Sequence, residues 1–527
     1  MKFYSLPILI ILTLLSSINI QGNSKKFSKN NILIKNSNLL LNTSVPNKIY
    51  EHFKTENEII NNGKLVADFS VTEFPVENQI YKRDKATSTS AVKVSGNCMS
   101  SSGFSSLVLE VYRNNVLFLT ETQNLIYSGN SANFNFTASI NAELADYKFK
   151  LVSNTGTVLK EASKVASGDI YIVTGQSNSV ISSYYPSIFP LSNPFVRTVS
   201  NTNVFTPNLT LNGSFGIGGI GYHFAYEIVT NEEIPVLVLN GGRGGKPISF
   251  FQRNDTNKES THTNYGVLLK RYTNAGLLPS DVTSIIWYQG ESDGSNTNVT
   301  NYHNLFDDLY NDWKEDYNPA NFYVFQVHKG CGISSASPIP EAHRQIANNY
   351  TDVGIISTNG ALQGADGCHY VGTDGYEVLG KRLYKMLAFE VYNSISSSGV
   401  YSPDITNVKY SETQNIISFD LLPATDTFRF ESGAHTDFFL ENNTSVTITG
   451  GSVSSNTVTL NLSGSLDETT TLLSYLGRAK ARSPYIKNQN DIGMLSFKNV
   501  PIELKCTIPT FTQIAPICEG ESLSALP

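Results

Sequence analysis

The feature that most constrains the fold is a regular succession of short apolar runs between about residues 166 and 395, each followed by a polar loop. The apolar runs lie at 169–173, 234–239, 284–288, 322–326 and 354–357. Segments with helical patterns lie between them, and include 222–231, 302–313 and 375–392. Alternating strands and helices predict a parallel sheet covered by helices on both faces. In such sheets the functional site lies at the carboxyl ends of the strands, which is where these polar loops follow.

Two regions with strand-like patterns flank this part of the chain. Residues 65–165 contain short alternating runs separated by Gly, Asn and Ser turns, which predicts a β-sandwich domain. Residues 396–502 return to short runs rich in Thr, Ser and Val, and predict a second, small β domain. We therefore expect an α/β protein whose α/β domain, residues 166–395, lies between two β domains.

The two ends of the chain differ from the regions between them. Residues 1–22 contain an apolar run at 6–15 that is shorter than the roughly 20 residues a membrane helix needs, and they predict a secretory signal peptide. Residues 23–64 are rich in Asn, Lys and Ser, and we expect a poorly ordered leader. Residues 503–527 are a tail interrupted by prolines. No later run is long and apolar enough for a membrane span, so we expect a secreted or cell-surface protein.

Composition narrows the class of function. The net charge is −7, only 16% of residues are charged, and no long Lys/Arg cluster occurs, which argues against nucleic-acid binding. The five cysteines form no C-x-x-C pair, so the sequence indicates no metal site. Cys331 and Cys368 are either a disulfide bracing the second motif described below or free buried thiols. Cys506 and Cys518 can staple a loop in the tail, which leaves Cys98 unpaired.

Two polar segments carry the residue types of a serine hydrolase. Ser177 follows the run at 169–173, and a serine on a strand-to-helix turn exposes its hydroxyl beside N–H groups that can face an anion. Asp366 precedes His369 by three residues, so its carboxylate can hold the imidazole Nδ1–H and leave Nε2 for a hydroxyl proton. Taken alone, a Ser/Asn/Gly loop of the first kind is usually no more than a turn.

Three further positions lie at the ends of predicted strands. Gln289 follows the run at 284–288, where a side-chain amide can donate to an oxyanion, although a glutamine that only ties down its loop is more common. The glycine-rich loop at 240–248 lets a backbone N–H approach a ligand closely, although most such loops only turn. His328 follows the run at 322–326 and is a reserve candidate for contacting substrate.

Together these segments resemble the SGNH hydrolase superfamily, specifically its sialic acid-specific acetylesterase branch, which includes carbohydrate esterase family six. Four motifs of the family occur in the family's order: G-D-x-W-x-x-x-G-Q-S-N-M at 168–179, G-G-T-P-I at 244–248, W-Y-Q-G-E at 287–291, and D-x-x-H before a K/D-G-Y helix at 366–376. The chain departs from the family pattern at Tyr171, Ser179 and Lys246, none of them in the predicted triad. The resemblance covers about residues 166–392 and implies a three-layer α/β/α, flavodoxin-like fold.

The resemblance also implies roles for individual residues. Ser177 would be the nucleophile, His369 the general base and acid, and Asp366 the residue that orients His369. The oxyanion hole would combine the N–H groups of Ser177 and Gly245 with the side-chain amide of Gln289. Further candidates for substrate binding are Gln176, Asn178, Lys246, Glu291 and His328. Glu291 would be the second choice as acid partner if Asp366 pointed away.

The function implied by the resemblance is an exported esterase that removes acetyl groups from a carbohydrate without a metal or cofactor. An alternative is a glycan-binding surface protein with a residual hydrolase fold. It is suggested by the flanking β domains and by residues 509–518, which resemble the start of repeated modules in large surface proteins of Bacteroidetes-type bacteria. An esterase for lipid or small acyl esters ranks lowest, because no long apolar lid segment occurs near the motifs. The complete set of Ser177, Asp366 and His369 favours the carbohydrate esterase, and neither the sugar nor the oligomeric state follows from the sequence.

Overall fold

The computed structural model describes residues 59–61, 64–66, 69–180, 193–200, 204–207, 216–295, 299–443, 445–466, 472–476 and 483–504. The predicted signal peptide, all but a few residues of the predicted leader, and the tail from residue 505 onward lie outside the described residues. In the part of the chain that is described, no helix is long and apolar enough to cross a membrane.

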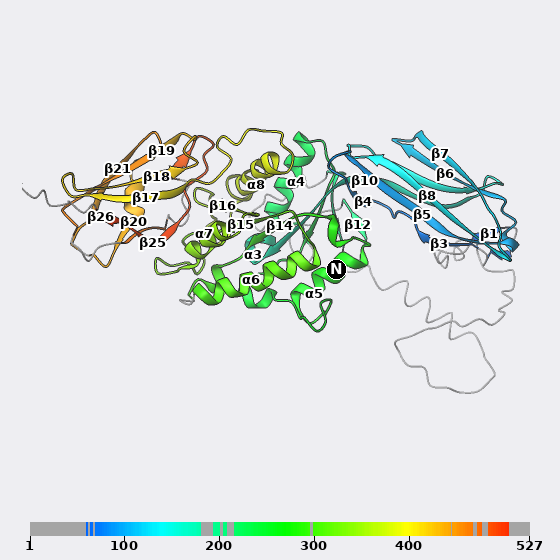
Figure 1. Cartoon of the computed structure of the whole chain (residues 1–527), viewed down its shortest axis with the longest axis horizontal. Helices are drawn as coiled ribbons and strands as arrows, with labels where there is room; N and C mark the ends of the chain where they lie inside the picture. Colours follow the sequence, from blue (N-terminus) through cyan, green and yellow to red (C-terminus); the bar gives the residue numbers. More distant parts are fainter. Residues whose placement is uncertain are drawn as a thin grey trace, which may run out of the picture. The chain divides into compact units, whose positions relative to one another are not determined.

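The centre of the molecule is a mainly parallel sheet with the strand order β12-β11-β13-β10-β14-β15-β16 (Figure 1). Its strands are β10 (Val158–Gly175), β11 (Val196–Val199), β12 (Phe205–Thr206), β13 (Val236–Asn240), β14 (Val282–Tyr288), β15 (Asn321–Gln326) and β16 (Val353–Ser357). All neighbours pair in parallel except β11 and β12. Every residue of β13 and β14 is buried, as expected for parallel strands covered on both faces.

Helices cover both faces of this sheet (Figure 1). They are α4 (Gly219–Asn231), α5 (Asn264–Asn274), α6 (Val299–Asp316), α7 (Ile339–Asn349) and α8 (Glu377–Glu390), with the single-turn helix α3 (Ser177–Val180) directly after β10. The helix α4 packs against α8 on one face, and α6 packs against α7 on the other. The predicted three-layer α/β/α fold is confirmed.

The strand β10 takes part in two regions of the molecule. Its first half pairs antiparallel with β9 (Tyr147–Ser153), and its second half pairs in parallel with β13 and β14. Side chains alternate between buried and exposed at the start of β10 and are all buried from Val165 onward. The expected strand at 169–173 is therefore the end of an 18-residue strand.

A buried ion cluster ties the second half of β10 to residues 82 and 83, which precede it in the chain. Asp169 has no exposed surface, and its carboxylate lies 2.8 Å from Lys82 Nζ and 3.0 Å from Arg83 Nε. Burial alone would raise the pKa of Asp169, but the two cations hold it below its ordinary value. Removing either cation would leave a buried charge with fewer partners, which is strongly destabilising.

Two β-rich regions flank the central sheet in sequence. The first places β3 (Phe69–Glu73), β5 (Thr89–Met99) and β8 (Ser131–Asn141) against β6 (Ser106–Arg113), β7 (Val116–Asn124) and β9, around one apolar core that includes Leu109, Phe136 and Phe149. Before β3 in the sequence, β2 (Lys64–Val66) pairs antiparallel with β1 (Ile59–Asn61). The short strand β4 (Ile80–Lys82) pairs with β10.

The second β-rich region follows the α/β part of the chain. A five-stranded sheet consists of β17 (Asp404–Ser411), β18 (Ile416–Leu422), β21 (Ile448–Ser454), β22 (Thr457–Leu462) and β26 (Glu503–Leu504). Two smaller sheets consist of β20 (Phe438–Glu441), β23 (Leu472–Tyr475) and β25 (Phe497–Pro501), and of β19 (Phe428–Phe430) with β24 (Ile486–Asn488). Residues of all three sheets share one apolar core, so the predicted fold class, an α/β domain with flanking β domains, is confirmed.

Candidate active site

The candidate nucleophile lies on a turn fixed by the backbone of two neighbouring strands. Gly175 ends β10 with φ +127°, and a Cβ atom there would overlap the carbonyl of Tyr288 at the end of β14. The next residue, Gln176, donates its N–H to that same carbonyl at 2.7 Å. Because only glycine allows this close approach, the chain turns at a fixed point and Ser177 begins the short helix α3.

The candidate acid and base lie on one loop after β16. The Oδ2 atom of Asp366 lies 2.7 Å from Nδ1 of His369. Its Oδ1 atom accepts the backbone N–H groups of Cys368 and His369 at 3.0 and 3.1 Å. The predicted D-x-x-H geometry is therefore present, and Asp366 does not point away from the imidazole. Because Asp366 occupies Nδ1, Nε2 is left for other partners.

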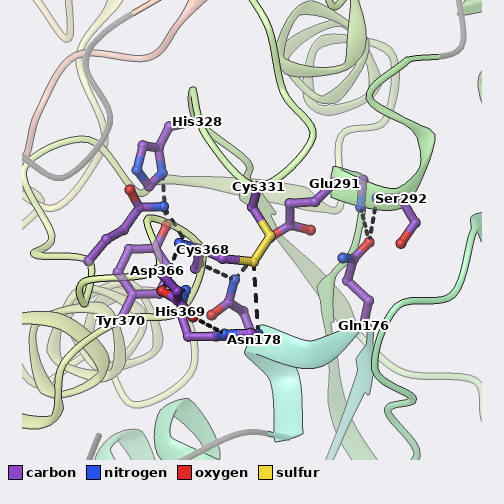
Figure 2. Close-up of a disulfide and its surroundings, with 12 residues drawn as sticks. Gln176, Asn178, Glu291, Ser292, His328, Cys331, Asp366, Cys368, His369 and Tyr370 are labelled. Carbon is purple, nitrogen blue, oxygen red and sulfur yellow. Dashed lines mark hydrogen bonds and ion pairs between the residues drawn. A yellow bond between two sulfur atoms is a disulfide. The ribbon is translucent and has the colours of Figure 1, made fainter.

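Asn178 connects the nucleophile turn to this loop (Figure 2). Its Nδ2 donates to the carbonyl of Cys368 at 3.1 Å and to Oε1 of Glu291 at 3.0 Å, and its Oδ1 accepts the Tyr376 hydroxyl at 2.9 Å. Asn178 directly follows the candidate nucleophile, and Cys368 directly precedes the candidate base. Asn178 has no exposed surface and links the turn to the loop, and its contact with substrate stays a prediction.

The disulfide alternative for Cys331 and Cys368 is the one the structure contains. It joins the loop after β15 to the loop that carries Asp366 and His369 (Figure 2). Cys98 is free and buried, while Cys506 and Cys518 lie outside the described residues.

Ser177 and His369 share no hydrogen bond in the described part of the chain. The Nε2 atom of His369 lies 3.9 Å from Sγ of Cys368. The side chains of Asp366 and His369 are 35% and 20% exposed, whereas Ser177 is 7% exposed. Hydrogen bonds of a catalytic constellation often tighten only when substrate binds, so this separation is compatible with a serine–histidine pair.

The glycine loop after β13 approaches the candidate nucleophile. A Cβ atom on Gly244 would lie 3.7 Å from Cβ of Ser177, so the loop passes directly over the serine. The next residue, Gly245, has φ +67° and carries the N–H predicted to face an oxyanion. Lys246 is exposed, and its Nζ lies 4.9 Å from the centre of the Phe250 ring. Of the predicted substrate contacts, Lys246 is the one whose side chain faces solvent.

Gln289, the predicted side-chain oxyanion donor, is hydrogen-bonded to protein groups, and its role as a donor stays a prediction. It has no exposed surface, and Nε2 has acceptors at the carbonyl of Lys246 (3.2 Å), Oδ2 of Asp293 (2.5 Å) and Oε1 of Gln176 (3.3 Å). Its Oε1 accepts the hydroxyl of Tyr302 at 3.0 Å. An amide nitrogen has two hydrogens, which these acceptors already occupy. Gln289 therefore ties its loop to the neighbouring loops, the reading that is more common for a glutamine at this place.

Gln176 has a similar structural role. Its Oε1 accepts the backbone N–H groups of Gly290 at 3.2 Å and of Ser292 at 3.1 Å, in addition to the amide of Gln289. Figure 2 shows the side chain directed at the loop after β14. These bonds fix the turn next to Ser177, so Gln176 positions the candidate nucleophile, and its contact with substrate stays a prediction.

Glu291 is a buried carboxyl group between the candidate nucleophile and the disulfide. Its Oε1 accepts from Asn178, and its Oε2 is buried with no hydrogen-bond partner in the described residues. Burial raises the pKa of Glu291 to about 7. Glu291 therefore holds Asn178 in place, and its contact with substrate stays a prediction. Asp366, not Glu291, lies beside His369.

His328 lies beneath the loop that carries the candidate base and not at its surface. Its Nδ1 lies 3.0 Å from the Thr358 hydroxyl and 2.8 Å from the Tyr370 hydroxyl, which in turn lies 3.0 Å from the hydroxyl of Tyr288. Burial lowers the pKa of His328 to about 4. The ring is hydrogen-bonded beneath the loop, and its reserve role in contacting substrate stays a prediction.

Sequence comparison identifies the family of the α/β domain. Residues 193–388 match the family described as carbohydrate esterase, sialic acid-specific acetylesterase. The α/β domain belongs to this family of carbohydrate esterases. The matched residues include Asp366 and His369, whereas Ser177 precedes them. No curated protein matches the chain.

Structural comparison finds similar folds among solved structures. The chain resembles a carbohydrate acetylesterase from Xanthomonas citri with a TM-score of 0.56 and 14% identity, over 82% of this chain and 99% of the other. A protein from Arabidopsis thaliana has 18% identity and a TM-score of 0.35 over 42% of this chain and 98% of its own, and the protein NanS has 14% identity and a TM-score of 0.32 over 43% and 99%. At these identities the likeness concerns the fold.

Sequence reasoning missed several residues that hold the esterase site together. Tyr376 is the last residue of the D-G-Y motif, and Asp293 lies two positions after the W-Y-Q-G-E motif. Their place in or beside a family motif could therefore have identified both residues. Tyr302 lies on α6 and bonds both Gln289 and His343 Nε2, at 2.8 Å for the second bond. In the sequence, Tyr302 looks like any tyrosine on the apolar face of a helix, so no local pattern identifies it.

Proposed function

We propose that the chain is an exported carbohydrate acetylesterase that hydrolyses O-acetyl esters with Ser177 as nucleophile, His369 as general base and acid, and Asp366 as the residue orienting His369. The observation that carries the proposal is the 2.7 Å contact between Asp366 and Nδ1 of His369, on a loop that is hydrogen-bonded to the residue after Ser177. An acyl transfer of this kind needs a nucleophile, a base with its free nitrogen available and a donor set for the oxyanion.

The proposed reaction proceeds in two steps. Ser177 Oγ attacks the acetyl carbonyl carbon, and its proton passes to His369 Nε2. The imidazolium then protonates the departing sugar oxygen, so that the sugar leaves as an alcohol. Water next loses a proton to the same nitrogen and attacks the acetyl-enzyme, so that acetate leaves and Ser177 regains its proton. The carboxylate of Asp366 stabilises the imidazolium that forms in both steps.

The proposed oxyanion donors are the backbone N–H groups of Ser177 and Gly245. The short separation between Gly244 and Ser177 supports this, because it brings the two backbone segments to the same side of the serine. Backbone donors are fixed before the reaction, so they need no reorganisation when the oxyanion forms. Gln289 is assigned a supporting role, because its amide already binds protein acceptors.

Export is supported by the disulfide as well as by the apolar run near the start of the chain. Disulfides such as Cys331–Cys368 persist in oxidising compartments and are rare in the cytosol. Export also fits the proposed substrate, because acetylated polysaccharides and glycoconjugates are found outside the cell membrane.

The decisive experiment replaces the nucleophile. Ser177→Ala should lower kcat for a chromogenic acetate ester by on the order of a thousandfold or more, because the covalent route is lost while binding groups remain. Ser101→Ala, at an exposed position in the first β-rich region, is the matched control and should retain wild-type activity. Acetate release from acetylated xylan, pectin and sialic acids, measured with both variants and wild type, identifies the sugar.

Two results would contradict the proposal. Full activity in Ser177→Ala would mean that another residue attacks the ester. Wild-type protein that binds the glycans but releases no acetate from any of them would favour the alternative of a binding protein with a residual hydrolase fold.

A further inference from the structure

We propose that the Cys331–Cys368 disulfide is a positioning element for His369, so that the esterase reaches its full rate only while this disulfide is oxidised. The proposal rests on the proposed function, because it takes His369 as the base. It adds a dependence on redox conditions that the arrangement of Ser177, His369 and Asp366 does not require.

Cys368 contacts each part of the proposed machinery. It precedes His369 directly, and its Sγ lies 3.9 Å from the imidazole Nε2, the nitrogen that would take the serine proton. Its N–H donates to Asp366 Oδ1 at 3.0 Å, and its carbonyl accepts Asn178 Nδ2 at 3.1 Å. A displacement of Cys368 would therefore move the base, its carboxylate partner and the link to the nucleophile turn together.

The other end of the disulfide is anchored on a tightly folded loop. Gly330, Cys331 and Gly332 have φ values of +115°, +52° and +96°, and Gly330 and Ile333 exchange two backbone hydrogen bonds of 3.0 Å. A Cβ atom on Gly332 would overlap the carbonyl of Glu291, so this loop lies directly on the loop after β14. Because a non-glycine residue rarely adopts a positive φ, the backbone at Cys331 is held by its surroundings.

Besides the disulfide, the loop that carries His369 is held by the hydrogen bond from Asn178 to the Cys368 carbonyl and by Tyr370, whose hydroxyl lies 2.8 Å from His328 Nδ1. Asp366 is exposed, and the turn from Gly364 to His369 is closed by its own hydrogen bonds, from Gly364 N–H to the His369 carbonyl at 2.7 Å and from Gly367 N–H to the Gly364 carbonyl at 3.0 Å. These bonds shape the turn but do not fix it relative to Ser177. In the described part of the chain, the disulfide is the one covalent link between this loop and another strand end.

The disulfide is accessible to soluble thiols, because both cysteines are partly exposed. A dithiol reductant would attack one sulfur, form a mixed disulfide and then close on itself. The protein would gain two electrons and two protons as the thiols of Cys331 and Cys368, and the reductant would leave as a cyclic disulfide. Without the link, His369 would sample positions farther from Ser177. Because a misplacement of about 1 Å can cost on the order of a hundredfold in rate, kcat should fall by about 10- to 100-fold.

The experiment measures kcat and KM for wild type with and without dithiothreitol, and for Cys331→Ala. Reduced wild type and the variant should both lose kcat by about 10- to 100-fold with KM within a factor of about two. Circular dichroism and thermal unfolding report whether each sample is folded. A general loss of structure would not leave KM and the near-ultraviolet spectrum unchanged, so the kcat-specific loss separates positioning from unfolding.

Two controls isolate this disulfide from the other cysteines. The double variant Cys331→Ala/Cys368→Ala should respond no further to dithiothreitol, and Cys98→Ala, in the buried core of the first β-rich region, should behave as wild type. Reoxidation of reduced wild type with oxidised glutathione should restore kcat. Thiol labelling followed by mass spectrometry establishes that Cys331 and Cys368 are reduced in the samples assayed, which also tests the proposal if the variants fail to fold.

Full kcat in wild type whose Cys331 and Cys368 are labelled as free thiols would overturn the proposal. A further decrease in kcat when the double variant is treated with dithiothreitol, as large as the decrease in wild type, would also overturn it, because the effect would come from another site. Failure of the proposed function has a different signature, since an oxidised wild type without esterase activity, or an active Ser177→Ala, contradicts that proposal before any reduction is made.

Discussion

The two halves of the candidate site are held in place by different means. The nucleophile turn follows the central strand β10, is buried, and is fixed by backbone contact between Gly175 and Tyr288. The loop with Asp366 and His369 follows the edge strand β16, is partly exposed, and is fixed by side-chain hydrogen bonds and a disulfide. The nucleophile turn therefore depends on the packing of the sheet, and the loop depends on a few individual links. A mutation of the glycine that fixes the turn should therefore act mainly on stability, and mutations in the loop mainly on rate.

The largest effect on the loop should come from Asp366→Asn. An asparagine of the same shape donates to the imidazole Nδ1 where the carboxylate accepts, so His369 is held in the tautomer that cannot take the serine proton. In a serine triad this change costs about 10,000-fold in kcat. We expect a loss of that order with the thermal midpoint nearly unchanged, measured by steady-state kinetics and calorimetry on the same preparation.

Glu291→Gln is the matched variant for this experiment, because Glu291 was the alternative acid partner. If Glu291→Gln lowers kcat more than Asp366→Asn does, the assignment of Asp366 as the orienting residue is wrong. A large loss of stability in Asp366→Asn would instead contradict the idea that this loop is independent of the sheet.

The nucleophile turn should respond in the opposite way to Gly175→Ala. The added methyl group would overlap the Tyr288 carbonyl at a φ of +127°, and the sheet would have to shift to accommodate it. Backbone strain of this kind costs roughly 1–3 kcal/mol before the steric overlap is added, so we expect a loss of about 3 kcal/mol or more in the free energy of unfolding. Urea unfolding measures it, and Gly244→Ala, where the nearest contact would be 3.7 Å, is the control for stability. Equal free energies of unfolding for Gly175→Ala and Gly244→Ala would refute the claim that backbone contact at Gly175 fixes the nucleophile turn.

The same difference explains how much of the molecule could be predicted from the sequence. The five apolar runs of the α/β domain are all strands. A strand that is buried on both faces consists of consecutive apolar residues, and this pattern is visible in the local sequence. The extent of β10 was not predicted, since its first half has the alternating pattern of a sandwich strand and its second half the apolar pattern of a parallel strand. The single strand passes from one environment to the other at Val165, where its pairing with β9 shifts register between Ala162 and Val165 without ending the strand.

Within the site, the motifs predicted which residues come together, but not which atoms are already occupied. The spacing of Asp366 and His369 was sufficient, because the contact is made within one turn. The hydrogen bonds of the Gln289 amide depend on Asp293 and Tyr302, which approach it from another turn and from a helix. The disulfide pairing depended on two loops from different strands, 37 residues apart in sequence. Such long-range contacts leave no periodic signal.

The smallest effect we expect concerns Glu291, which lies where the two halves meet. Its pKa in the folded protein, about 7, is raised by burial above the ordinary value of 4.5. Between pH 4.5 and 7 the folded state keeps a proton that the unfolded state has lost, so this residue makes the protein less stable as pH rises through that range. Glu291→Gln removes the titration while keeping an acceptor for Asn178. The stability lost between pH 5 and pH 8 should therefore shrink by on the order of 2 kcal/mol in the variant.

Urea unfolding at the two pH values measures this difference, and Glu121→Gln, at an exposed position on β7, controls for the loss of one carboxylate. The variant should also keep most of its kcat, because the hydrogen bond from Asn178 to position 291 can persist. An unchanged pH dependence in Glu291→Gln would mean that the carboxyl group is already ionised and compensated in the folded protein. The connection between the nucleophile turn and the loop would then include a buried charge, and the loop would depend on the sheet more closely than its other contacts indicate.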